Sequence, residues 1–130
     1  MALVLLYNIN EDAKRQKIGL AAWKLGIEAR VVSPAEYAQP IGLLLGLPGF
    51  SPVEEAAEPF SAEMLLMHGL SSAQFSAFLD ALRRSRAAVA LKAVATEHNV
   101  AWSSAALCRE LQQEHEAMKA AGKSVHRSQK

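Results

Sequence analysis

The sequence has a single cysteine and almost no net charge, and each shortage excludes a class of protein. Cys108 alone can form neither an internal disulfide nor a thiolate-rich metal site, so disulfide-stabilised folds and zinc ribbons are excluded. With 14 basic and 13 acidic residues the formal net charge is +1, which gives no overall field to attract nucleic acid or an anionic membrane. We therefore expect no nucleic-acid partner, no membrane partner and a cytoplasmic location.

Long hydrophobic runs and recognisable cofactor motifs are also missing. The apolar run at residues 2–7 is too short to span a bilayer, lacks a basic flank and leads directly into polar residues, so we expect neither a signal peptide nor a membrane segment. There is no glycine-rich phosphate-binding turn and no paired-histidine spacing on a helix. We predict no metal, no cofactor and no classical nucleotide site.

The chain does contain four short apolar runs that alternate with helical patterns, at residues 3–7, 29–32, 64–67 and 89–94. This alternation is typical of strand–helix units and a parallel sheet. At 130 residues and 51% hydrophobic content, the chain has the size of one globular domain. We place that single α/β domain at residues 1–118, followed by a basic C-terminal tail at 119–130 that frays, and we see no internal repeat.

The order of the strands follows from which runs are interrupted by charge. A strand covered on both faces must be apolar at every position, as the first and third runs are. Arg30 and Lys92 interrupt the second and fourth runs, which places those strands at the edges. We predict a small four-stranded, mostly parallel sheet of order 2-1-3-4, flanked by about four helices. A ferredoxin-like α+β arrangement is the alternative.

Helix boundaries are well marked in the sequence. Ser33 with Glu36, and Ser71 with Gln74, have the spacing of a capping box, and Ser103 suits the start of the last helix. The region 42–60 is rich in glycine and proline yet apolar. We expect it to pack on the sheet; a lid over a site is the alternative.

In a doubly wound sheet, ligands bind beyond the carboxyl ends of the strands where the winding reverses, here between the first and third strands. We expect candidate ligand-binding residues at that edge, namely Asn8, Asn10, His68, Ser71, Lys92, Thr96 and Asn99. No nucleophile–base pair accompanies them, so we predict no catalytic residues. The hypothesis is a non-catalytic module for a small molecule, a protein partner or a second copy of the chain. The alternative is a small enzyme that uses His68 or Lys92 at the carboxyl ends of the strands, which predicts that both residues line one pocket there.

Three segments resemble a small bacterial family classed only as a domain of unknown function. They are Leu6-Tyr7-Asn8, the stretch Tyr37-x-Gln39-Pro40-Ile41-Gly42, and the run from Leu91 to Trp102 with the later His115-Glu116-Ala117-Met118. The resemblance extends from the first strand to Met118 and implies a compact α/β protein with no assigned activity or cofactor. It marks seven positions that match a family pattern: Asn8, Tyr37, Gln39, Lys92, Thr96, Asn99 and Trp102.

Overall fold

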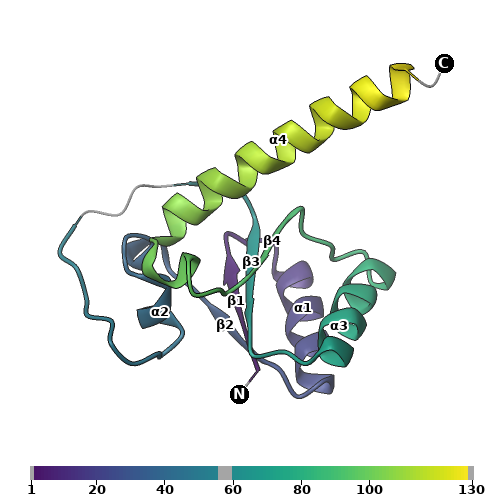
Figure 1. The fold of residues 1–130 in the computed structure, drawn as a ribbon. Helices are drawn as coiled ribbons and strands as arrows, with labels where there is room; N and C mark the ends of the chain where they lie inside the picture. The colour runs from purple at the N-terminus through teal and green to yellow at the C-terminus, as the bar shows by residue number, and fades with distance from the viewer. Residues whose placement is uncertain (1, 56–59, 129–130) are drawn as a thin grey trace.

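The computed structural model describes the backbone of residues 2–55 and 60–128, and side chains as far as residue 119. Within these residues, ten elements follow one another (Figure 1). They are β1 (Leu3–Tyr7), α1 (Asp12–Lys24), β2 (Glu28–Val31), the 3-10 turn η1 (Pro34–Glu36), α2 (Ile41–Leu44), β3 (Met64–His68), α3 (Ser72–Arg84), β4 (Leu91–Val94), the 3-10 turn η2 (Asn99–Ala101) and α4 (Ser104–Ser128).

The four strands form one sheet in the order β2-β1-β3-β4, which confirms the predicted order and α/β class. β1 pairs with β2 and β3 pairs with β4 in parallel, but the central pair β1 and β3 is antiparallel. The sheet is therefore mixed, and the expected parallel relation of the two central strands is wrong. The physical reason lies at Pro40, where the predicted second helix is broken into η1 and the four-residue α2. No helix long enough to run back along the sheet remains after this break, and β3 starts at the end where β2 stops.

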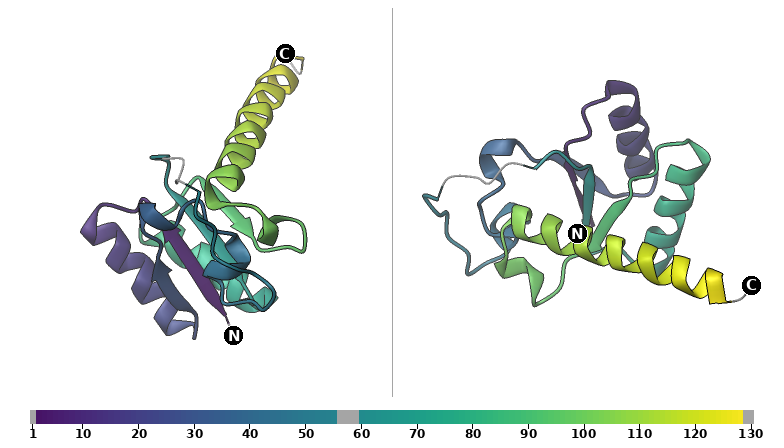
Figure 2. Two further views of the ribbon diagram at one scale, coloured as in Figure 1. Left: turned by 90° about the vertical axis from the view of Figure 1, so that its left-hand side faces the viewer. Right: turned by 90° about the horizontal axis from the view of Figure 1, so that it is seen from above.

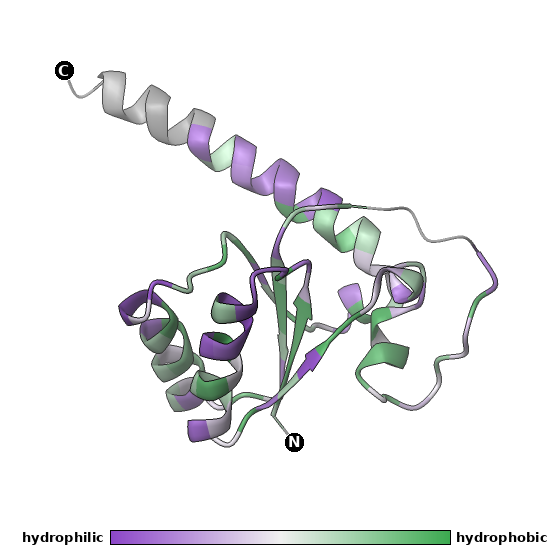
Figure 3. Cartoon of the chain, turned by 180° about the vertical axis from the view of Figure 1, so that it is seen from behind, coloured by the Kyte–Doolittle hydropathy of each residue, from purple (hydrophilic) through white to green (hydrophobic). Residues whose placement is uncertain are grey.

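Each face of the sheet has its own core. Side chains alternate along a strand, so Val4 and Leu65 lie on the face covered by α1 and α3, while Leu5 and Leu66 lie on the opposite face. That second face is covered by the segment around α2 and by the start of α4 (Figures 1 and 2). Hydropathy follows the same layers, with the central strands strongly hydrophobic and the projecting part of α4 largely hydrophilic (Figure 3). α4 continues past residue 118 to Ser128, so the boundary of the domain at 118 stays a prediction.

The two halves of the sheet are structural copies of one another. Each half is a strand–helix–strand unit whose elements have 5, 13 and 4 residues. Leu5 faces Leu66 at the centre of the antiparallel pair, so a pseudo-two-fold axis passes between them. Helix ends match as well: the N–H of Ile27 donates to Ala22 O at 2.8 Å, and that of Ala87 donates to Leu82 O at 2.8 Å. The chain thus contains an internal structural repeat that was not predicted from the sequence.

The polar turns beyond the outer strands also correspond. The N–H of Ser33 donates to the Glu36 carboxylate at 3.1 Å, and the N–H of Thr96 donates to Asn99 Oδ1 at 2.9 Å. These two turns have the same place in the two halves, directly after β2 and β4. The halves differ in one connection. Residues 88–90 lie between Ala87 and β4, whereas the corresponding Ile27 is followed directly by β2.

The region after η1 packs on the sheet, as expected, in the part that the structure describes. Leu44 and Leu45 are buried in the second core. The Gln39 amide holds Val53 by two hydrogen bonds of 2.9 Å, one to its carbonyl and one from its N–H. The Phe50 ring lies over Gly42. The lid alternative concerns a region that includes residues 56–59, which lie outside the described residues.

We predict that Gly42→Ala destabilises the protein, because a Cβ at this position would lie 2.3 Å from the Phe50 ring. The ring would have to leave its site, and overpacking of this kind costs about 1–3 kcal/mol of unfolding free energy. Urea denaturation measures the change. The control is Gly19→Ala in α1, where a Cβ meets nothing within 4 Å and where alanine should raise stability by roughly 0.5–1 kcal/mol. Equal stability of Gly42→Ala and wild type would contradict the packing described for Phe50.

Candidate functional site

The predicted ligand-binding residues lie at two opposite ends of the sheet. Asn8 and Asn10 follow β1 at the end where β3 begins, since Tyr7 faces Met64. His68 faces Leu3 at the other end, where Ser71, Thr96 and Asn99 also lie. Because β1 and β3 are antiparallel, these residues do not share the single crevice that a parallel central pair would have formed. Their individual roles in ligand binding stay predictions.

Asn8 connects three segments of the protein. Its backbone has φ +60°, a left-handed conformation that asparagine tolerates better than most residues. The side-chain Nδ2 donates to the carbonyls of Phe60 and Ala62, both at 3.0 Å, and Oδ1 accepts from the Tyr37 hydroxyl at 2.8 Å. Every polar atom of this amide is therefore engaged in tying β1 to η1 and to the chain before β3. This explains Asn8 and Tyr37 without a ligand.

An aromatic cluster surrounds that connection. The Tyr37 and Phe60 rings stack with centroids 4.5 Å apart, and the Tyr7 ring lies 5.7 Å from Tyr37. The Tyr7 hydroxyl accepts a hydrogen bond from Ser104 Oγ at 2.8 Å, inside the core. Burial raises the pKa of Tyr7 far above its ordinary value, and burial also raises the pKa of Tyr37. Both phenols therefore stay protonated and act as hydrogen-bonding core residues.

Three further candidates build turns and helix ends. Asn99 accepts from the Thr96 N–H, and its own N–H donates to Thr96 Oγ1 at 3.1 Å. Asn99 Nδ2 also donates to Val94 O at 3.0 Å, which fixes the chain as it leaves β4. Ser71 Oγ accepts from the Gln74 N–H at 3.1 Å, completing the predicted capping box of α3. Local hydrogen bonds thus account for all three side chains.

His68 and Lys92, the two residues of the enzyme alternative, lie on opposite faces of the sheet. Lys92 is the Cα partner of Leu65, whose side chain is in the core under α1 and α3. His68 is an odd number of residues from Leu65, so alternation along β3 turns it to the other face. Lys92 is exposed, and its Nζ donates to Val89 O at 2.7 Å. One pocket that contains both residues is therefore not formed.

Lys92 instead borders a groove between α3 and β4. The groove encloses about 230 Å³. Its apolar walls include the buried Leu82 and Val89, and cationic side chains stand at its border. The three residues 88–90, which the first half of the protein lacks, form one side of it. Its lining residues are Leu79, Leu82, Arg83, Ala88, Val89 and Lys92.

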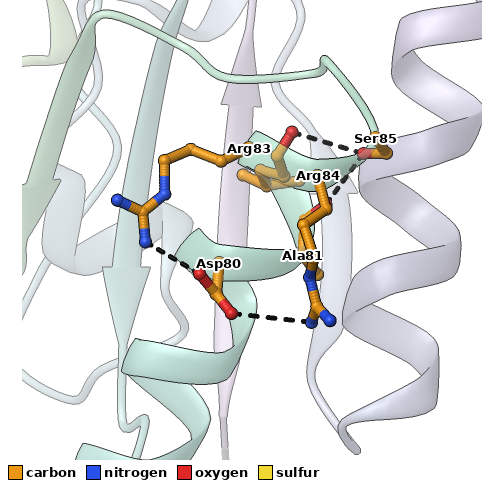
Figure 4. Close-up of polar contacts among 6 residues, drawn as sticks. Asp80, Ala81, Arg83, Arg84 and Ser85 are labelled. Carbon is orange, nitrogen blue, oxygen red and sulfur yellow. Dashed lines mark hydrogen bonds and ion pairs between the residues drawn. The ribbon is translucent and has the colours of Figure 1, made fainter.

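The charge at this groove comes from the last turn of α3. Asp80 accepts from Arg83 at 2.8 Å and pairs with Arg84 at 3.6 Å, and the two guanidinium groups approach its carboxylate from opposite sides (Figure 4). One carboxylate is thus shared between two arginines, and Lys92 adds a third cation nearby. Both arginines are well exposed, so water and salt weaken their field. The groove combines an apolar interior with a net positive border.

Sequence reasoning identified Lys92 but missed the groove itself. The signal available was the paired Arg83 and Arg84 at the end of a helix, which the sequence alone explains by the helix dipole. The groove beside these arginines depends on the three inserted residues 88–90. The insertion is visible only when the connection before β4 is compared with the connection before β2, and only the structure shows that the two connections correspond.

Other ionisable groups form no further site in the part of the chain that the structure describes. No three of the described histidine, cysteine, aspartate and glutamate side chains are placed to hold a metal ion. Cys108 is buried in the second core, and burial raises the pKa of its thiol. None of the described helices combines the length and the apolarity needed to cross a bilayer.

The fold is thus an α/β domain of two strand–helix–strand units joined across an antiparallel central pair. Residues 63–118 match a family model described as "Domain of unknown function (DUF3783)", which confirms the resemblance to a family without an assigned activity. The matched residues contain the second unit, η2 and α4 as far as Met118. The similar positions noted at residues 6–8 and 37–42 lie outside the match. No curated protein and no solved structure gives a significant match.

We expect Asn8→Gly to lower the free energy of unfolding by about 1–3 kcal/mol, since glycine accepts the positive φ but leaves the Phe60 and Ala62 carbonyls without their donor. Chemical denaturation measures the loss. The matched control is Asn10→Gly, at an exposed position two residues later, for which less than about 1 kcal/mol is expected. If Asn8 served only to bind a ligand, Asn8→Gly would leave the free energy of unfolding unchanged.

The buried Tyr7 predicts a loss of stability at alkaline pH. Unfolded tyrosine ionises near pH 10, whereas burial keeps folded Tyr7 protonated. Above that pH the unfolded state binds fewer protons than the folded state, so stability falls as the pH rises. Urea denaturation at pH 8 and pH 10.5 should show a steeper fall for wild type than for Tyr7→Phe. Parallel pH dependences of the two proteins would disprove the assignment to Tyr7.

Proposed function

We propose that the protein is a non-catalytic binding module whose groove between α3 and β4 holds a small amphipathic anion, such as a carboxylate on a short apolar chain. The observation that carries this proposal is that Lys92 and Arg83 line the same groove as the apolar side chains of Leu79, Leu82 and Val89. A carboxylate at the border would meet two cations, and the attached chain would lie against Leu79, Leu82 and Val89.

The size of the groove supports a small ligand. A volume of about 230 Å³ is below the roughly 300–1,000 Å³ of pockets that enclose drug-sized molecules. Lys92 Nζ gives one hydrogen bond to Val89 O, and an ammonium group has three donors. It can therefore bind an anion while it keeps its present contact.

A binding role is preferred to catalysis because the candidate acid–base residues are not assembled. His68 and Lys92 lie on opposite faces, and the side chains of Asn8, Thr96 and Asn99 are engaged in hydrogen bonds within the fold. A cytoplasmic location belongs to the same proposal; the one cysteine, Cys108, is kept as a buried free thiol, as suits a reducing compartment.

The test is a thermal-shift titration with hexanoate, with hexan-1-ol and hexylamine as probes of equal chain length. Hexanoate should raise the melting temperature, hexan-1-ol less so and hexylamine not at all, and added salt should weaken the hexanoate effect. A ligand at 100 times its Kd stabilises the folded state by about 2.7 kcal/mol.

Two variants and a control locate the binding. Lys92→Met keeps the unbranched apolar stem of the side chain but removes its ammonium group, and Ala88→Phe fills the groove; both should abolish the hexanoate shift. Lys24→Met, on the exposed side of α1, should retain it. The proposal is wrong if hexylamine stabilises as well as hexanoate does, or if the shift survives in Lys92→Met.

A further inference from the structure

β2 is an edge strand whose outer side is open. The N–H of Glu28 donates to Ala2 O at 2.9 Å and that of Val32 to Leu6 O at 3.0 Å, so alternate residues face β1. Ala29 and Val31 therefore turn their N–H and C=O groups away from the sheet. All four residues of β2 are exposed, and no described segment is hydrogen-bonded to this outer edge.

Large apolar side chains are exposed on β2 and on the helix that packs over it. Val31 on β2 is 59% exposed, and Leu20 and Trp23 on α1, the helix packed over β2, are 52% and 75% exposed. Leu20 and Trp23 are three residues apart and share one side of α1. An exposed apolar set next to an unpaired strand is typical of an interaction surface.

The second half of the protein provides an internal comparison. The helix ends correspond at Ala22 and Leu82, so Leu20 and Trp23 have their counterparts in Asp80 and Arg83. On α3 these positions carry the ion pair of Figure 4, whereas on α1 they carry an exposed leucine and tryptophan. The same unit is thus charged on one side of the pseudo-two-fold axis and apolar on the other.

We infer that β2 pairs antiparallel with β2 of a second copy of this chain, so that the two sheets join into one of twice four strands. The charges on the strand select this occupant. Glu28 and Arg30 form an ion pair at 2.9 Å within one chain. They lie two residues apart, on one face of the strand. A strand with opposite charges at i and i+2 is complementary to its own antiparallel copy.

The register follows from which residues face outward. Hydrogen-bonded pairs must join outward-facing residues, so the two-fold axis can pass at Ala29, Arg30 or Val31. An axis at Arg30 sets two arginines against each other, and an axis at Val31 sets Arg30 against Val32. Only an axis at Ala29 puts Glu28 opposite Arg30 of the partner, twice. These are non-hydrogen-bonded positions, where side chains approach most closely.

The other edge of the sheet does not offer this complementarity. The N–H of Ala95 donates to Met67 O at 2.8 Å, so Lys92 and Val94 face outward on β4. Any antiparallel self-pairing of β4 sets Lys92 against itself or against a neutral residue. An outward lysine on an edge strand discourages such pairing.

The same axis brings the two α1 helices together on one face of the joined sheet. With the axis at Ala29, residues 28–30 of the two β2 strands lie opposite one another, and so short a ladder alone buries less than the roughly 1,200 Å² of a stable specific interface. The rest of the interface would come from contacts between the two α1 helices, whose exposed residues include Leu20 and Trp23.

Sedimentation velocity and light scattering over a wide concentration range test this inference on the full chain. We expect a reversible dimer. Arg30→Glu and Glu28→Arg each place like charges opposite one another and should raise the dimer Kd about tenfold or more. The double reversal Glu28→Arg/Arg30→Glu restores both pairs and should recover the wild-type Kd. Glu110→Arg on α4, an exposed charge reversal away from β2, is the control.

Ala29→Pro provides a second route, because the N–H that proline removes faces outward and makes no bond to β1. It should abolish the dimer while circular dichroism shows a folded monomer. A wild-type chain that stays monomeric at millimolar concentration overturns the inference, as does a dimer that persists in Ala29→Pro. The proposed register is wrong if the folded single variants dimerise more weakly than wild type and the double reversal does not restore the wild-type Kd. Capture of an extended peptide of a different protein by a monomeric chain would overturn the choice of a second copy.

Discussion

The antiparallel pairing of β1 with β3 is the constraint on which the rest of this structure depends. Both strands are buried on both faces, and their register sets Leu5 against Leu66 at the centre of the domain. The pairing relates the two strand–helix–strand units by a pseudo-two-fold axis, so α1 and α3 cover one face, and the segment around α2 and the start of α4 cover the other. It also sends the polar turns of the two halves to opposite ends of the sheet, which prevents a single central crevice.

Once the framework is recognised as two copies of one unit, differences between the copies become the best guide to function. The second copy has three extra residues before its outer strand and a charged helix surface, and there the groove with Lys92 forms. The first copy has no such insertion and exposes Leu20 and Trp23. A small anion in one half and a second chain at the other are independent proposals, because they rest on different side chains and different edges.

The sequence predicted much of the framework but little of the site. Strand order followed from Arg30 and Lys92, because an unpaired charge cannot be buried in a central strand. The helix starts at Ser71 and Ser103 followed from local hydrogen-bonding chemistry. The direction of β3 relative to β1 was predicted wrongly. After the break at Pro40, residue patterns do not show at which end of the sheet the next strand begins. The role of Asn8 was out of reach because its partners, Phe60 and Ala62, lie far along the chain and are brought to it only by the tertiary fold.

The pseudo-two-fold axis has a consequence for the evolution of this architecture. The residues that match the family model contain only the second copy and the helix after it. A polypeptide limited to that copy would leave the Leu66 edge of β3 without hydrogen-bond partners and half of a core exposed. Two such polypeptides could close the same sheet about a true symmetry axis. The present chain achieves that closure within one polypeptide, so its two halves are free to carry unlike surfaces.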